Sequence, residues 1–277
     1  MRAYELTRPT GPEMPIVVDS PHSGRHYPGD FDAGLPLWRL RQGEDAFVDQ
    51  LWAGAPAAGA SLLTANFPRV YIDPNRSLED IDEALLDAPW PGPVTESTKT
   101  RLGIGLVWRQ MGEGLPIYER RLSVAEVEQR IARCYQPYHQ ALNAALDEAH
   151  QRFGKRWHLN VHSMPDDSYA QLGLPEQQLA DFVLGDLDGS CADATTMLVL
   201  EGALRAHGYS VARNDPFKGV EIIRRSGQPA RHCHAVQIEI KRSLYMNVQT
   251  HQPNAGFARA KAAIDALLAA LARHARA

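Results

Sequence analysis

The chain has 277 residues, 44% of them hydrophobic, and a formal net charge of −4. This length and apolar content are enough for one substantial core, so we predict a single domain over residues 1–277. The charge, together with the absence of a long Lys/Arg run, argues against nucleic acid or an anionic membrane as a partner.

Apolar runs rich in β-branched residues alternate with helical patterns along the chain. The expected strands cover residues 16–19, 61–65, 69–73, 157–161, 209–212, 219–224 and 235–241, and the expected helices cover residues 45–53, 123–154, 193–207 and 255–276. This alternation predicts an α/β fold with a mixed, largely parallel central sheet flanked by helices.

The longest predicted helix carries signals for its start, its interruption and its end. Ser123 and Glu126 have the S-x-x-E spacing of a capping box, and Gly154 is suited to close the helix. Pro137 is expected to kink it. Before this helix, residues 87–108 are dense in Pro and Gly, and an irregular stretch of this length favours a functional lid over a linker between domains.

Cysteine usage and the N-terminal segment predict the compartment. Cys134, Cys191 and Cys233 lie far apart and form no C-x-x-C pair, which is typical of reduced thiols. The first 15 residues lack the apolar stretch of a signal peptide, and no window of about 18 apolar residues predicts a membrane span. We therefore expect a soluble, cytoplasmic protein, and the sequence does not predict its oligomeric state.

Two histidines, His22 and His162, follow apolar runs and are each followed directly by Ser. Because ligands collect where loops leave the carboxyl ends of strands, these side chains could converge on one zinc ion. A third ligand would come from the segment "GEDAFVDQLW", where Glu44, Asp45 and Asp49 are candidates and a carboxylate near the helix start is best placed. Spacing alone does not exclude simpler roles. The histidines could form ordinary hydrogen bonds, and the carboxylates could be helix caps or surface charges.

A carboxylate and several cations complete the candidate site. Glu239 lies inside the apolar strand "AVQIEIKRS", where a carboxylate is costly without a partner or a function, so it is a candidate general base or half of a structural ion pair. Arginine matches a carboxylate with two parallel hydrogen bonds. Candidate binders of a substrate carboxylate are Arg69, Asn75, Arg76, Lys218 and Arg224.

These segments line up with one family. The series "SPHSG", "DAFVDQLW", "RVYIDPNR", "PYHQAL", "NVHS", "LGDLDGSC", "NDPFKG" and "HAVQIEIKRSLYM" resembles, in one order, the N-formylglutamate amidohydrolases, whose fold is similar to that of the zinc carboxypeptidases. The resemblance implies one Zn²⁺ per chain held by His22, Asp45 and His162, with Glu239 as the base. It also implies that the five candidate carboxylate binders lie near the substrate's carboxylates.

The chain departs from the related patterns at two places. Arg25 stands where the zinc carboxypeptidases carry a ligating Glu, so the carboxylate ligand must come from elsewhere, and Asp45 is the inferred choice. Val220, Glu221 and Arg225 differ from the segment that follows "FKG" in the formylglutamate enzymes of histidine degradation, which concerns specificity for the substrate.

The sequence thus predicts a metal-dependent hydrolase of a linear amide bond, acting on N-formyl-L-glutamate or a close N-acyl amino acid. Zinc chemistry with Glu239 as proton acceptor and an arginine cluster for the carboxylates would account for this reaction. Two alternatives are a carboxypeptidase-like hydrolase of another N-acyl amino acid or a peptide, and a protein that binds a metal or a carboxylate without turnover.

Overall fold

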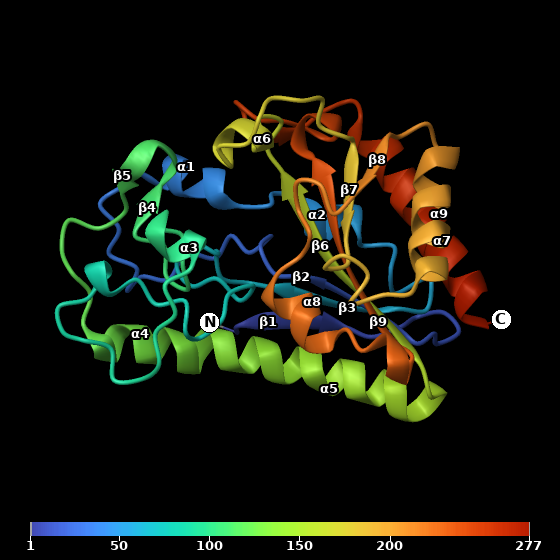
Figure 1. The fold of residues 1–277 in the computed structure, drawn as a ribbon, viewed down its shortest axis with the longest axis horizontal. Coiled ribbons are helices and arrows are strands. Elements are labelled where there is room, and N and C mark those ends of the chain that lie inside the picture. Colours follow the sequence, from blue (N-terminus) through green and yellow to red (C-terminus); the bar gives the residue numbers. More distant parts are fainter. Residues whose placement is uncertain (1, 277) are drawn as a thin grey trace. The chain divides into compact units, whose positions relative to one another are not determined.

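The computed structural model describes residues 2–276, apart from the side chain of Glu113. Its main element is a seven-stranded sheet with the spatial order β1-β3-β2-β6-β9-β7-β8 (Figure 1). The strands are β1 (Tyr4–Thr7), β2 (Ile16–Ser20), β3 (Ser61–Ala65), β6 (Arg156–Met164), β7 (Phe182–Gly185), β8 (Val211–Arg213) and β9 (Cys233–Lys241). Strands β2, β6 and β9 run parallel, and β7 is antiparallel to β9. The predicted mixed, largely parallel sheet with flanking helices is confirmed.

The remaining elements are short pairs of strands and the helices. The strand pairs are β4 (Gln110–Met111) with β5 (Leu115–Pro116), and β10 (Met246–Asn247) with β11 (Gln252–Pro253). The helices are α1 (Leu37–Leu40), α2 (Val48–Leu51), α3 (Thr98–Arg101), α4 (Val124–Arg130), α5 (Gln136–Phe153), α6 (Ser168–Gln171), α7 (Ala194–Ala206), α8 (Glu221–Ser226) and α9 (Phe257–Arg276). The predicted helices 193–207 and 255–276 are confirmed as α7 and α9, to within two residues at each end.

Contacts between residues divide the chain into two compact units. One comprises Met1–Glu5, Pro21–Ala46 and Thr64–Leu142, and the other comprises Leu6–Ser20, Phe47–Leu63 and Asn143–Ala277. The second unit holds β2, β6, β7, β8 and β9 together with α7, α8 and α9. That residues 1–277 form a single domain stays a prediction.

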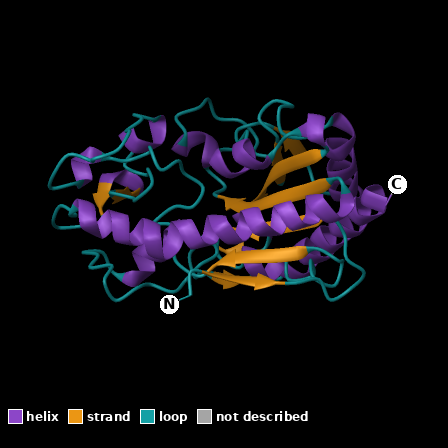
Figure 2. Cartoon of the chain, turned by 90° about the horizontal axis from the view of Figure 1, so that it is seen from below, coloured by secondary structure: helices purple, strands orange, loops and turns teal. Residues whose placement is uncertain are grey.

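The central strand β6 is buried along its whole length, so both of its faces are covered. On one face Trp157 donates a hydrogen bond to Thr196 of α7 (2.9 Å) and packs edge-on against His274 of α9. On the other face His158 contacts Ser226 of α8 (2.8 Å). By the alternation of a strand, residues 156, 160, 162 and 164 lie on the same face of β6 as His158. They are buried as well, although most of them are polar. Figure 2 shows the strands side by side, with the C-terminal half of α5 passing in front of them.

The predicted long helix is present but interrupted. Ser123 and Glu126 form the expected capping box at the start of α4, and Gly154 follows α5 with a positive φ of 70°. Between α4 and α5 the chain makes a π-helical segment, Ile131–Tyr135, that ends two residues before Pro137. A proline lacks the N–H for the helical ladder and crowds the preceding turn, which accounts for the wider turn at this point.

Two predicted strands are wrong. Residues 69–73 form turns, because Asp73 accepts a hydrogen bond from the backbone N–H of Asn75 (2.9 Å) and the segment lies between two prolines. Residues 219–224 instead lead into helix α8, which packs on β9 and β6. A strand at residues 219–224 could not pair with β9, because β6 and β7 lie on its two sides.

Of the predicted helix over residues 45–53, only α2 forms. Phe47 has a positive φ of 64°, which a helix cannot contain, so the helix begins after it and Asp45 lies outside. Strands β1 and β7 have no counterpart in the sequence-based prediction. Among the helices within residues 2–276, none combines the length and apolar character needed to cross a bilayer.

Candidate functional site

The turn after β2 places His22 at the end of the strand. β2 ends at Ser20, and the backbone N–H of Asp45 donates to the carbonyl oxygen of His22 (3.0 Å), which joins the two predicted ligand segments. Gly24 is required here, because a Cβ at this position would lie 2.1 Å from the carbonyl oxygen of Phe67. The chain can therefore fold back sharply enough to bury His22, whose exposed fraction is 1%.

Asp73 is the hub of the polar contacts around His22. Its Oδ1 lies 2.7 Å from Nε2 of His22, and its Oδ2 accepts hydrogen bonds from Nε (3.2 Å) and Nη2 (2.9 Å) of Arg69. Nη2 of Arg76 is 3.6 Å from the same oxygen, and Trp108 donates to it from its indole nitrogen (3.4 Å). This fully buried carboxylate thus holds one imidazole and two guanidinium groups at once.

The charge state of Asp73 follows from these neighbours. Burial alone would raise the pKa of a carboxyl, but Arg69, Arg76 and His22 outweigh it and hold the pKa of Asp73 well below its usual range. Carboxylates face both ring nitrogens of His22, and the shorter contact, Asp73 at Nε2 (2.7 Å, against 3.3 Å for Asp45 at Nδ1), favours a neutral ring with its proton on Nε2 and its lone pair on Nδ1. That atom is the one that faces Asp45.

Asp45 lies next to His22 and Arg69. Its Oδ2 is 3.3 Å from Nδ1 of His22, and its Oδ1 is 3.8 Å from Nη1 of Arg69. The neighbouring Glu44 is differently engaged, because it accepts a hydrogen bond from the hydroxyl of Tyr27 (2.8 Å). Burial raises the pKa of Glu44, although Tyr27 and Arg41 act in the opposite direction. Of the acidic residues that the sequence left open, Glu44, Asp45 and Asp49, the structure places Asp45 beside His22.

His162 lies inside β6 rather than in a loop after the strand, and it pairs in register with Glu239 of β9. Its Nε2 is 2.6 Å from Oδ1 of Asn160. Glu239 accepts a hydrogen bond from Nε2 of Gln237 (3.0 Å), two residues earlier on the same strand. Both Glu239 and His162 are buried, and each contacts a side-chain amide two residues earlier on its own strand.

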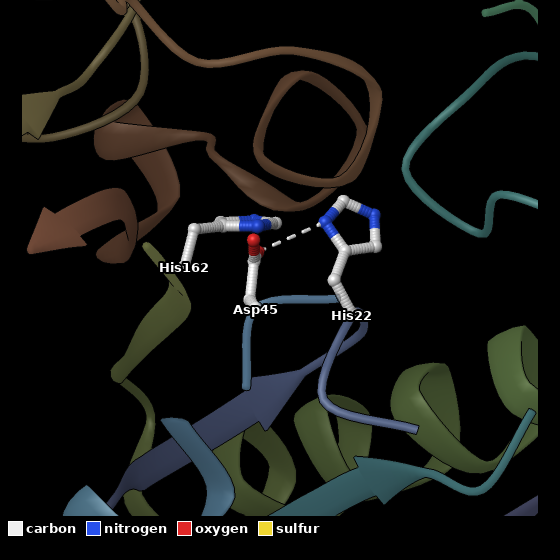
Figure 3. A group of neighbouring side chains, drawn as sticks. All are labelled: His22, Asp45 and His162. Carbon is white, nitrogen blue, oxygen red and sulfur yellow. Dashed lines mark hydrogen bonds and ion pairs between the residues drawn. The ribbon is translucent and has the colours of Figure 1, made fainter. Parts of the chain in front are cut away.

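One group of candidate metal ligands emerges within residues 2–276. His22, Asp45 and His162 each offer one ligand atom, and these atoms all lie within 4.8 Å of one another. Figure 3 shows both imidazole rings next to the carboxylate of Asp45. Two imidazoles and one carboxylate form a donor set that suits zinc and similar divalent metals.

The five residues predicted to bind a substrate carboxylate differ in their surroundings. Arg76 is buried, with hydrogen bonds from Nε to the carbonyl oxygen of Ile104 and from Nη1 to that of Asn75 (both 3.0 Å). Lys218 and Arg224 have exposed side chains, which pair with Asp188 (2.8 Å) and Glu221 (2.6 Å) respectively. The other two are Arg69, which contacts Asp73 and Asp45, and the buried Asn75.

Sequence reasoning missed several polar residues of the site: Asp19, Asp73, Trp108, Asn160 and Gln237. The signal for Asp73 was present, since a carboxylate between two arginines at i−4 and i+3 is placed to pair with both. For Asn160 and Gln237 the signal was an amide two residues before a candidate side chain, on the same face of a strand. Trp108 lay within the predicted lid, residues 87–108, but nothing in the sequence singled it out as a partner of Asp73.

Comparison with known proteins decides the family. The family model for N-formylglutamate amidohydrolase matches residues 14–246. The chain belongs to this family. It is 31% identical to N-formylglutamate deformylase of Pseudomonas putida over 237 residues, which cover 84% of this chain and 82% of the relative. The corresponding deformylase of Pseudomonas aeruginosa is 30% identical over 240 residues, covering 85% and 84% of the two chains. Relatives in this family are hydrolases, and this chain is one as well.

One solved structure agrees with the family assignment, and a second agrees with the fold. The crystal structure of N-formylglutamate amidohydrolase from Ralstonia eutropha JMP134 is 49% identical, covers 100% of this chain and 99% of its own, and superposes with a TM-score of 0.98. A gene product from Agrobacterium tumefaciens shares the fold at 18% identity and a TM-score of 0.66, with 99% and 96% of the two chains covered.

The contacts of Asp73 generate a prediction about stability. Asp73→Asn leaves buried Arg76 without its compensating charge, so we expect the free energy of unfolding to fall by about 3–5 kcal/mol. Denaturant unfolding in the presence of a chelator measures it. Asp188→Asn, in the exposed pair with Lys218, is the control and should change little. Equal effects of the two substitutions would contradict the role assigned to Asp73.

Proposed function

We propose that this protein is a metal-dependent amidohydrolase that releases formate from N-formyl-L-glutamate or a closely related N-acyl amino acid. The observation that carries the proposal is the group of His22, Asp45 and His162, with His162 in register with Glu239 on the adjacent strand. The names of relatives that match most of the chain support the choice of substrate.

The residues present fit one divalent metal, which we propose to be Zn²⁺. The donor set is two imidazoles and a carboxylate, and an Asp73–His22 contact is the usual support for a ligating histidine, since it fixes the ring and its tautomer. A zinc ion held by three protein ligands lowers the pKa of water and polarises a carbonyl oxygen. His22, Asp45 and His162 would hold it.

Glu239 is the proposed proton acceptor. The water oxygen attacks the formyl carbon while the Glu239 carboxylate takes up a water proton, and this proton then passes to the leaving nitrogen as the C–N bond breaks. Formate and the free amino acid are the products. The hydrogen bond from Gln237 leaves Glu239 an acceptor and restricts its orientation, which suits a base that must act in one direction.

Recognition of the substrate's carboxylates is proposed for Arg69, Asn75, Arg76, Lys218 and Arg224. Lys218 and Arg224 have exposed side chains that pair with Asp188 and Glu221, so a substrate carboxylate can replace either of these carboxylates. Arg76 would have to give up an existing hydrogen bond to do the same. Residues 87–108 are proposed as a lid, and their last residue, Trp108, reaches Asp73 with its indole nitrogen.

A cytoplasmic location and a place in histidine degradation belong to the same proposal. Cys134, Cys191 and Cys233 are all free thiols in the structure, which supports a reducing compartment. A small-molecule substrate is consistent with the hydrolase family.

The activity is tested by measuring formate release from N-formyl-L-glutamate and from the neutral N-formyl-L-methionine. We expect turnover of both, with the higher kcat/KM for the acidic substrate, because a pocket with cations recognises a second carboxylate. Turnover of longer peptides only would favour the carboxypeptidase-like alternative. A metal-loaded protein that releases no product from any of these compounds would favour the binding protein.

The choice of ligands predicts how metal retention responds to substitution. Asp45→Asn should weaken zinc binding strongly, because it removes the charged donor, whereas Asp49→Asn on α2 should leave zinc binding nearly unchanged. Elemental analysis after dialysis reports the zinc content of both variants. Similar losses in the two variants, or full retention by Asp45→Asn, would show that another carboxylate holds the metal.

The role of Glu239 predicts a loss of turnover without a loss of binding. Glu239→Gln keeps the shape of the side chain but cannot accept a proton, so kcat for formate release should fall by roughly 10²–10⁴ with KM little changed. Steady-state kinetics on zinc-loaded protein measures both constants. A variant with the turnover of the unchanged protein would rule Glu239 out as the base.

A further inference from the structure

Asn160 connects His162 to a buried carboxylate. It lies two residues before His162 on β6, so both side chains emerge on the same face of the strand. Its Oδ1 is 2.6 Å from Nε2 of His162, and its Nδ2 donates to Oδ1 of Asp19 (2.8 Å), its register partner on β2. Asp19 and Asn160 both have exposed fractions of 0%.

The carboxylate of Asp19 decides which way the amide of Asn160 faces. An ionised carboxylate accepts hydrogen bonds and donates none, so only the NH₂ group of Asn160 can face it. The amide oxygen must then point to His162. The orientation of an amide, which is otherwise ambiguous, is fixed here by its charged neighbour.

The amide oxygen in turn decides the tautomer of His162. An oxygen acceptor 2.6 Å from Nε2 requires a proton on that nitrogen, and in a neutral ring the lone pair is then on Nδ1. We propose that Asp19, acting through Asn160, sets the tautomer of His162 and presents Nδ1 as the metal ligand. This inference rests on the proposed metal-binding function and adds two positioning residues to it.

The chain of contacts Asp19–Asn160–His162, called the relay below, is held in place at Asp19. His158 contacts Oδ1 of Asp19 with Nε2 (2.8 Å), and its Nδ1 contacts Oγ of Ser226 (2.8 Å), which also donates to the carbonyl oxygen of Ile222 (3.0 Å) in α8. Asp19 is therefore fixed between two side chains of β6, His158 and Asn160. A carboxylate with two partners in a dry interior has little freedom to turn, and neither has the amide that it orients.

The first experiment reads the tautomer directly in the full-length, metal-free protein. Long-range ¹H–¹⁵N correlation spectra of the imidazole rings, recorded at a pH where histidines are neutral, should show the Nε2–H form for His162. The signal is assigned by its loss in His162→Gln. A ring that carries its proton on Nδ1, or a mixture of the two forms, would overturn the proposal, whether or not the protein hydrolyses any substrate.

The second experiment measures zinc affinity by competition with a chelator. Asn160→Leu keeps the approximate volume but removes the acceptor for Nε2–H, and we expect the dissociation constant for zinc to rise 10–100-fold. Thr196→Val is the matched control, since it removes a buried hydrogen bond from Trp157 on the opposite face of β6 and touches none of Asp19, Asn160 and His162. Its dissociation constant should change by less than about threefold, within the spread expected of a distant site.

A double-mutant cycle separates the relay from a general structural role. Asp19→Asn removes the group that forces the amide orientation, so alone it should weaken zinc binding, but in the Asn160→Leu background it should have no further effect. Additive effects would show that Asp19 acts independently of Asn160, and unchanged zinc affinity in folded Asn160→Leu would also overturn the proposal. If the unchanged protein binds no zinc, the proposed function fails, while the tautomer measurement still decides this inference.

Discussion

The buried carboxylate of Asp73 is the interaction on which the surroundings of His22 depend. It is fully buried and lies within contact distance of Arg69, Arg76 and His22. Removing two guanidinium groups and a carboxylate from water is expensive, and the cost is offset only when they face one another with good geometry. The same contact fixes the His22 ring, so the stability of this region and the direction of Nδ1 have one cause.

A second constraint comes from covering both faces of the central strands. Polar residues on β6 and β9 are buried, so a hydrogen-bond partner inside the protein lowers the cost of placing them there. Asn160 bonds to His162 and Asp19, and Gln237 bonds to Glu239. Hydrogen bonds between neighbours therefore offset part of the cost of burying these polar side chains, and the two reactive ones, His162 and Glu239, are each held in one orientation as a result.

The family assignment and the local geometry answer different questions. Membership follows from a match over residues 14–246 and from relatives that cover most of the chain. It supports hydrolysis of an N-formyl amino acid, whereas the placement of His22, Asp45 and His162 supports the metal chemistry. Helix α8 adds a feature of this chain, because Glu221 there pairs with Arg224 (2.6 Å), one of the cations proposed to meet a substrate carboxylate.

The sequence alone determined the class of fold and the capping box at Ser123, because periodicity and capping are local properties. The candidate ligands His22, Asp45 and His162 came from the resemblance to a family, since residue chemistry by itself left the carboxylate ligand open. The sequence did not determine that residues 69–73 turn or that residues 219–224 form a helix, because a short apolar run fits either structure until the neighbours of β9 are known. The contact of Asp73 with His22 spans 51 residues and that of Asn160 with Asp19 spans 141. Only the tertiary structure could decide those contacts, since the first depends on how the turn with Asp73 folds against the turn after β2, and the second on β2 and β6 lying side by side.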